Sequence, residues 1–150
     1  MDVIDIQVSK ALDTFTINAG VLDVDIHSEC WGGEEPSIVE EPLCTVRARI
    51  GELVDGKDKW WKVADDMAAE DIALHVDKFV LPFFEKMHSR EGMVEHLTNA
   101  KVIMRNYPPP VIYLALLKRR LGNVHEACAL LSELRNNTTG TWHPRITEIS

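Results

Sequence analysis

The chain has 150 residues, of which 45% are hydrophobic and 27% charged. These values are ordinary for one globular domain and exclude a chain that is disordered throughout. The formal net charge of −8 disfavours binding to nucleic acid phosphates. No basic segment followed by an apolar run opens the chain, and the most apolar run, residues 111–117, is too short to span a membrane. We therefore expect a single cytoplasmic domain over residues 1–150 that contacts neither nucleic acid nor a membrane.

Residues 1–66 are predicted to be mainly β-structure, because three runs alternate apolar and polar residues with a period of two. The alternation assigns one side to the core: Ile4, Ile6, Val8, Phe15, Ile17, Ala19, Val21, Val46, Ala48 and Ile50. It assigns the other side to solvent: Asp5, Gln7, Ser9, Thr14, Thr16, Asn18, Thr45, Arg47 and Arg49. The short link at residues 11–13 favours a hairpin and hence an antiparallel sheet. Residues 60–63 are a candidate fourth strand.

The segment between the second and third runs is acidic and is predicted to be a loop, residues 22–42. It contains Gly32-Gly33 and two prolines, which favour irregular structure. It has no Lys or Arg, and its acidic residues are Asp23, Asp25, Glu29, Glu34, Glu35, Glu40 and Glu41. Such a segment attracts a basic protein partner. The alternative is a solvated loop that only keeps the protein soluble.

Residues 67–136 are predicted to be helical, and residues 137–150 a polar tail that Trp142 could anchor. Two apolar stripes at helical spacing cover residues 72–83, interrupted by Pro82, and 93–104. Residues 111–121 and 124–134 form a helix pair with a stop at Gly122 and a cap at Asn123. This pair is similar to one helical hairpin of a tetratricopeptide array, but no second copy follows at the expected period.

Three segments carry a family resemblance: residues 15–21, residues 44–53, and Lys59-Trp60-Trp61 with the helix down to residue 84. Together they resemble the bacterial family known as domain of unknown function 4304, over roughly residues 3–90. The resemblance implies a bacterial origin and a strand-then-helix α+β fold. From the alternating runs and the helical stripes we expect a small antiparallel sheet of three or four strands, covered on one face by three to five helices. The resemblance carries no activity and no functional residues. Family members usually have a further helix and strand before the region that corresponds to residue 3.

Candidate binding residues come from the acidic segment, the strands and the tryptophans. Arg47 and Arg49 point to one side of a strand and could grip a carboxylate or phosphate, unless they pair with acids of the sheet. Trp31 and Trp60 are candidate interface anchors, since exposed tryptophans often dominate binding energy. The predicted partner-binding set is Trp31, Glu34, Glu35, Glu40, Glu41, Arg47, Arg49 and Trp60.

The patterns of catalytic and metal sites are weak in this sequence. His27 and Cys30 have the spacing of one ligand pair, but structural zinc sites usually show two close pairs. Cys30, Cys44 and Cys128 are odd in number and widely spaced, which favours free thiols. No nucleophile elbow or phosphate loop is present. We predict no cofactor and no metal.

The leading hypothesis is a non-enzymatic, acidic protein-binding domain, such as an immunity protein or antitoxin. One alternative is a small hydrolase or metal-dependent enzyme that uses His27, Cys30 and the face with Arg47 and Arg49. The other is a self-associating scaffold, a homodimer in which the N-terminal edge strand pairs with its copy.

Overall fold

The computed structural model describes residues 1–33, 35–99 and 107–150. Contacts divide the chain into two compact units. The sheet unit comprises Met1–Leu22 and Ile38–His88, and the helical unit comprises Asp23–Ser37 and Ser89–Ser150. The predicted helical part, residues 67–136, is thus shared between them. Across the described residues, no helix combines the length and the apolar character that crossing a membrane requires.

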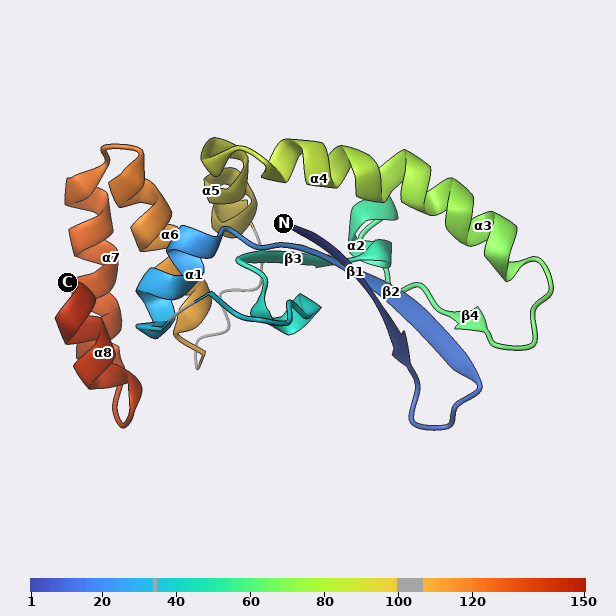
Figure 1. Ribbon diagram of the computed structural model, residues 1–150, viewed down its shortest axis with the longest axis horizontal. Coiled ribbons are helices and arrows are strands. Elements are labelled where there is room, and N and C mark those ends of the chain that lie inside the picture. The colour runs from blue at the N-terminus through green and yellow to red at the C-terminus, as the bar shows by residue number, and fades with distance from the viewer. Residues whose placement is uncertain (34, 100–106) are drawn as a thin grey trace. The chain divides into compact units, whose positions relative to one another are not determined.

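The sheet unit contains a four-stranded antiparallel sheet, which confirms the predicted α+β class (Figure 1). Its strands are β1 (Asp2–Val8), β2 (Thr14–Val21), β3 (Val46–Arg49) and β4 (Trp61–Lys62). The β1–β2 hairpin pairs along its whole length, with Ile6 opposite Ile17. On its other edge β2 pairs with β3 and, nearer the hairpin turn, with the short β4. Opposite residues share a face, so the register fixes the composition of both faces.

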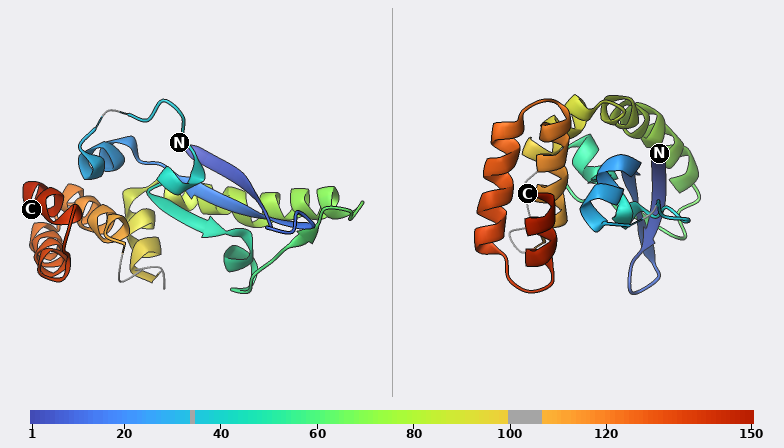
Figure 2. Two further views of the ribbon diagram at one scale, coloured as in Figure 1. Left: turned by 90° about the horizontal axis from the view of Figure 1, so that it is seen from below. Right: turned by 60° about the vertical axis from the view of Figure 1, so that its left-hand side comes forward.

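One face of the sheet carries the core of this unit. Ile17, Ala19 and Val21 of β2 are buried together with Val46 and Ala48 of β3. A helical rod runs beside this sheet and consists of α3 (Ala68–His75), the π-helical segment η2 (Val76–Val80) and α4 (Leu81–Met87) (Figure 2). Trp61 stacks on Phe15 at 5.9 Å and donates from its indole to Asp71 of α3 at 2.7 Å. The rod is therefore fixed to the sheet by both apolar and polar contacts.

Pro82 was predicted to interrupt the helix, and the interruption is the π-helical segment η2, which ends two residues before Pro82. Proline has no N–H to donate to the preceding turn, so the ladder must change there. Pro82 then lies in the first turn of α4.

The assignment of β1 to a packed face was wrong. Ile4, Ile6 and Val8 are 46%, 61% and 48% exposed, because β1 lies at the edge of the sheet and its apolar row extends past the buried part of the face. The assignment of the polar residues to the solvent side was also wrong at three positions, since Thr16, Asn18 and Thr45 are buried. The Thr16 hydroxyl donates to the Lys59 carbonyl at 2.7 Å, so the segment that leads into β4 covers this position.

Two short helices flank β3. They are the 3-10 turn η1 (Glu41–Leu43) before the strand and α2 (Ile50–Val54) after it. Close packing here depends on small residues: a Cβ on Gly20 would lie 2.7 Å from Cys44 Sγ, and one on Gly51 would lie 1.9 Å from the Lys57 carbonyl oxygen.

The helical unit contains α1 (Val24–Trp31), α5 (Arg90–Asn99), α6 (Pro109–Arg120), α7 (Val124–Asn137) and α8 (Trp142–Ile149). Helices α6 and α7 run antiparallel through a turn at Gly122, whose φ of 85° suits glycine (Figure 2). The core of the unit contains Ile112, Leu116, Leu117, Leu131 and Ile146. The predicted stripe end at Met104 lies outside the described residues.

Two predictions about this unit were wrong. The predicted acidic loop contains helix α1, and the predicted polar tail contains helix α8. In α1, Ile26 and Cys30 are both buried and lie four residues apart. In α8, Ile146 and Ile149 are both buried and lie three residues apart. Each is one short apolar stripe among polar residues, which gives a weak periodic pattern.

Candidate functional site

Helix α1 begins and ends at well-defined caps. The Asp23 carboxylate accepts from the Ile26 amide at 3.2 Å, and this is the usual role of aspartate before the first turn. Gly32 ends the helix with a φ of 70°, and its amide donates to the Ser28 carbonyl at 2.8 Å. Trp31 is the last residue of the helix, so its position is set by this cap.

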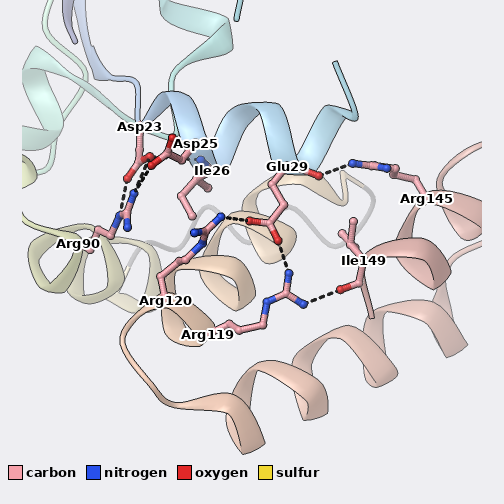
Figure 3. Close-up of polar contacts among 9 residues, drawn as sticks. All are labelled: Asp23, Asp25, Ile26, Glu29, Arg90, Arg119, Arg120, Arg145 and Ile149. Carbon is pink, nitrogen blue, oxygen red and sulfur yellow. Dashed lines mark hydrogen bonds and ion pairs between the residues drawn. The ribbon is translucent and has the colours of Figure 1, made fainter. Parts of the chain in front are cut away.

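Arginines from the rest of the helical unit bind the acidic residues of α1 (Figure 3). Arg90 of α5 donates to both oxygens of Asp23, at 2.8 and 3.2 Å, and to Asp25 at 3.0 Å. Burial raises the pKa of the Asp23 carboxyl, but the bonds from Arg90 and Ile26 outweigh burial and leave that pKa below its ordinary value. Asp23 therefore caps the helix and also ties it to α5.

Glu29, in the next turn, lies between two guanidinium groups from the end of α6 (Figure 3). Arg119 donates to one carboxylate oxygen and Arg120 to the other, the latter at 2.8 Å. Burial raises the pKa of Glu29, and the two arginines overcome that effect and hold it below its ordinary value. Arg119 also donates to the Ile149 carbonyl at 2.8 Å, which connects α6 to the end of α8.

Arg145 of α8 binds backbone carbonyls at the C-terminal end of α1. It donates to the Cys30 carbonyl at 2.9 Å and also to the Glu29 carbonyl. Unpaired carbonyls at a helix end attract cationic side chains. Arg145 also pairs with Glu148 within α8 at 2.5 Å.

Trp31 is held in one orientation but remains 44% exposed. Its indole N–H donates to the Tyr113 hydroxyl of α6 at 2.8 Å. The Trp142 ring of α8 meets it edge to face, with centroids 5.0 Å apart. The His27 ring, one turn earlier in α1, lies with its centre 6.0 Å from the centre of the Trp31 ring. The exposed part of the ring is therefore an ordered aromatic surface.

The predicted partner-binding residues fall into both units. Trp31 and Glu35 belong to the helical unit, and both are exposed. The others that the structure describes belong to the sheet unit: Glu40, Glu41, Arg47, Arg49 and Trp60. Glu34 lies outside the described residues.

Within the sheet unit these residues mostly bind one another. Glu41 is buried and takes two bonds from Arg47. Arg49 donates to Gln7 at 3.2 Å and to Asp58 at 3.0 Å. The indole of Trp60 also donates to Asp58, at 2.8 Å, and Arg49 lies 5.6 Å from the centre of that ring. Glu40 is exposed.

His27 and Cys30, the residues proposed for a metal-dependent enzyme, are buried, and so is Cys44. Burial raises the pKa of each of the two thiols to about 12, so neither is a thiolate at neutral pH. In the described parts of the chain, no group of three or more His, Cys, Asp or Glu side chains could hold a metal ion.

Sequence reasoning missed Arg90, Arg119, Arg120 and Arg145 as partners of α1. They lie 65 to 116 residues away from the groups they bind, so spacing in the sequence gives no information about them. Tyr113 was missed for the same reason, because its hydroxyl accepts from Trp31, which lies 82 residues away in the sequence.

One comparison with known proteins gave a match. The family model described as domain of unknown function (DUF4304) matches residues 1–86, which include nearly all of the sheet unit together with α1. Neither the curated proteins nor the solved structures gave a match.

Proposed function

The chain belongs to the family of domain of unknown function 4304, and we propose that it is a non-enzymatic protein-binding domain that docks its partner on the exposed ring of Trp31. The partner in this proposal is a protein with an apolar pocket bordered by basic groups. The cell compartment is the bacterial cytoplasm, where the three free thiols stay reduced.

The single observation that carries the proposal is the ordered exposure of Trp31. Its side chain loses little conformational entropy on binding, because Tyr113 and Trp142 already fix it. Tryptophan is among the residue types that are enriched at the hot spots of protein interfaces. Most of the described apolar side chains of this unit are buried or partly buried, so an exposed indole held by Tyr113 and Trp142 favours a role in binding.

The acidic residues contribute less than their number suggests. Asp23, Asp25 and Glu29 bind arginines of the same unit, and Glu41 binds Arg47. Glu35 and Glu40 are the exposed acids that remain among the described residues of the segment. We therefore infer a basic partner from the net charge of −8 and not from single acidic residues. A net charge of this size attracts a basic partner over a distance and raises the association rate.

An immunity protein or antitoxin is the specific class that we propose, since such a protein neutralises another protein by binding alone. A hydrolase or metal-dependent enzyme has less support, because His27, Cys30 and Cys44 are buried and both thiols are protonated at neutral pH.

The experiment uses a partner captured from bacterial lysate, then purified and titrated against variants of the full chain. Trp31→Ala should weaken binding by about 2 kcal/mol or more, roughly 30-fold. Val124→Ala, which shortens another exposed apolar side chain of the helical unit, should leave the affinity unchanged. A partner that binds Trp31→Ala as tightly as the wild type would disprove the anchor. An association rate that does not fall with added salt would disprove the electrostatic part.

A further inference from the structure

Strand β1 leaves one edge of the sheet open. In the part of the chain that the structure describes, β1 pairs with β2 alone. The Ser9 amide donates to the Thr14 carbonyl at 2.8 Å, and the Met1 ammonium donates to the Leu22 carbonyl at 2.9 Å. Odd-numbered residues therefore direct their backbone groups toward β2. In an antiparallel ladder the even-numbered residues between them direct theirs to the open edge.

The same even-numbered residues carry the exposed apolar row. Ile4, Ile6 and Val8 stand opposite Ala19, Ile17 and Phe15, so they lie on the face of the sheet that forms the core. An open strand edge combined with an exposed apolar row favours the addition of another strand, and natural proteins usually block such edges. Here three successive outward-directed residues are Ile, Ile and Val.

We propose that this edge pairs with β1 of a second copy of the chain, antiparallel about a two-fold axis at Ile6. Residues whose backbone groups face the open edge must pair with residues of the other copy whose backbone groups also face it. This requirement leaves few registers. The axis at Ile6 sets Ile6 against its own copy and Ile4 against Val8 of the other copy. All three apolar side chains then meet apolar side chains, and the two sheets become one continuous sheet.

Charges select the same register. An axis at Asp5 would oppose two Asp5 carboxylates, and an axis at Ile4 would oppose Asp2 to Ile6. With the axis at Ile6, Asp5 opposes Gln7, and Lys10 of each copy lies close to Asp2 of the other. The Asp2 carboxylate already accepts from His88 at 2.9 Å, and it has acceptor capacity for Lys10 as well. A second copy of this chain is thus a complementary occupant of the edge.

The first test is the oligomeric state of the full chain, measured by size-exclusion chromatography with light scattering. The wild type should have twice the mass of one chain, and Ile6→Lys should be a monomer at the same concentration, because it sets two ammonium groups opposite each other. The exposed Leu74→Lys, on α3 of the same unit, is the matched control and should remain a dimer. Circular dichroism checks that both variants fold. A monomeric wild type, or a dimer that survives Ile6→Lys, would overturn the proposal.

Cysteine cross-linking tests the register in a Cys128→Ser background, which removes the exposed native thiol. Opposed residues of a hydrogen-bonded pair have Cα atoms about 5.5 Å apart, within the range that a disulfide spans. Ile6→Cys should therefore form a dimer under mild oxidation. Ile4→Cys should not, because its copy is four residues away along the strand, about 13 Å. Equal cross-linking of both variants, or preference for Ile4→Cys, would overturn the register. Lys10→Asp should weaken the dimer, and Asp2→Lys added to it should restore it.

Discussion

Glu41, in the turn η1 before β3, and Arg47, in β3, form a bidentate ion pair. Arg47 Nε lies 2.6 Å from Glu41 Oε1, and Arg47 Nη2 lies 2.9 Å from Oε2. The Glu41 side chain is buried, whereas that of Arg47 is 48% exposed. A planar guanidinium matches a carboxylate in this way, and the geometry orders η1 against the start of the strand. The structure therefore gives this pair a role in stability, although both residues were first predicted to contact a partner.

The two halves of this pair should differ in the cost of their removal. Arg47→Met leaves a buried carboxylate without its main cation and should lower the free energy of unfolding by about 3 kcal/mol. Glu41→Gln leaves Arg47 able to reach water and should cost about 1 to 2 kcal/mol. The measurement is urea denaturation followed by circular dichroism. Glu40→Gln, at the exposed neighbour, is the control and should change stability by less than about 0.5 kcal/mol. Equal values for Glu40→Gln and Glu41→Gln would contradict the assigned role.

A methyl group at Gly51 should disrupt the sheet unit. Its Cβ would lie 1.9 Å from the Lys57 carbonyl oxygen and 2.8 Å from the Lys59 amide nitrogen, and both are backbone atoms. Because Lys59 also accepts from Thr16, the segment cannot move without the loss of a buried hydrogen bond. Gly51→Ala should cost at least about 3 kcal/mol, the upper part of the range for overpacking.

Gly33→Ala is the matched control for this substitution, since among the described residues no atom beyond the immediate chain neighbours lies within 4 Å of the added Cβ. It should be neutral or slightly stabilising, because alanine restricts the unfolded chain more than glycine does. Thermal unfolding of both variants checks the pair of predictions. A Gly51→Ala variant as stable as the wild type would show that the segment at residues 57–59 packs differently.

The sequence allowed the sheet to be predicted because its periodicity is local. Alternation identified β1, β2 and β3, and Gly122 with Asn123 identified the α6–α7 turn. The predicted cap itself was wrong, because the Asn123 side chain makes no capping hydrogen bond. The exposure of Ile6 was not predictable in this way. Alternation shows which residues share a face, but coverage of that face depends on helices from elsewhere in the chain.

The candidate site was harder to predict than the fold. Trp31 was predicted to be exposed, as the structure shows, but the helix that positions it was predicted to be a loop. The acidic residues on that helix suggested an external basic partner, whereas Arg90 and Arg119 supply cations from within the chain. Composition gives the number of charges, and only the fold shows which of them are already paired.

Acid should weaken the attachment of α1 within its unit. The pKa values of Asp23 and Glu29 are lowered in the folded state, so their ion pairs stabilise the fold fully above the ordinary carboxyl pKa. That stabilisation is lost as the pH falls through the lowered values, because the unfolded chain then binds more protons. Asp23→Asn keeps a capping side chain but removes the charge. Its deficit in unfolding free energy relative to the wild type should be largest near pH 7 and should shrink below about pH 4. The exposed Asp77→Asn is the control, and a deficit of Asp23→Asn that stays constant with pH would contradict the role of the Arg90 pair.

The three thiols should differ sharply in reactivity. Burial raises the pKa of Cys30 and Cys44 to about 12, whereas Cys128 is exposed on α7. Because the thiolate is the reactive form, an aromatic disulfide reagent at pH 8 should modify one thiol per native chain and three per chain in denaturant. Cys128→Ser should abolish the native reaction, and Cys30→Ser should leave its amplitude unchanged. Rapid modification of a second thiol in the native state would mean that α1 or the segment at Cys44 opens readily, and hydrogen exchange at the Gly32 and Cys44 amides would identify which of the two does so.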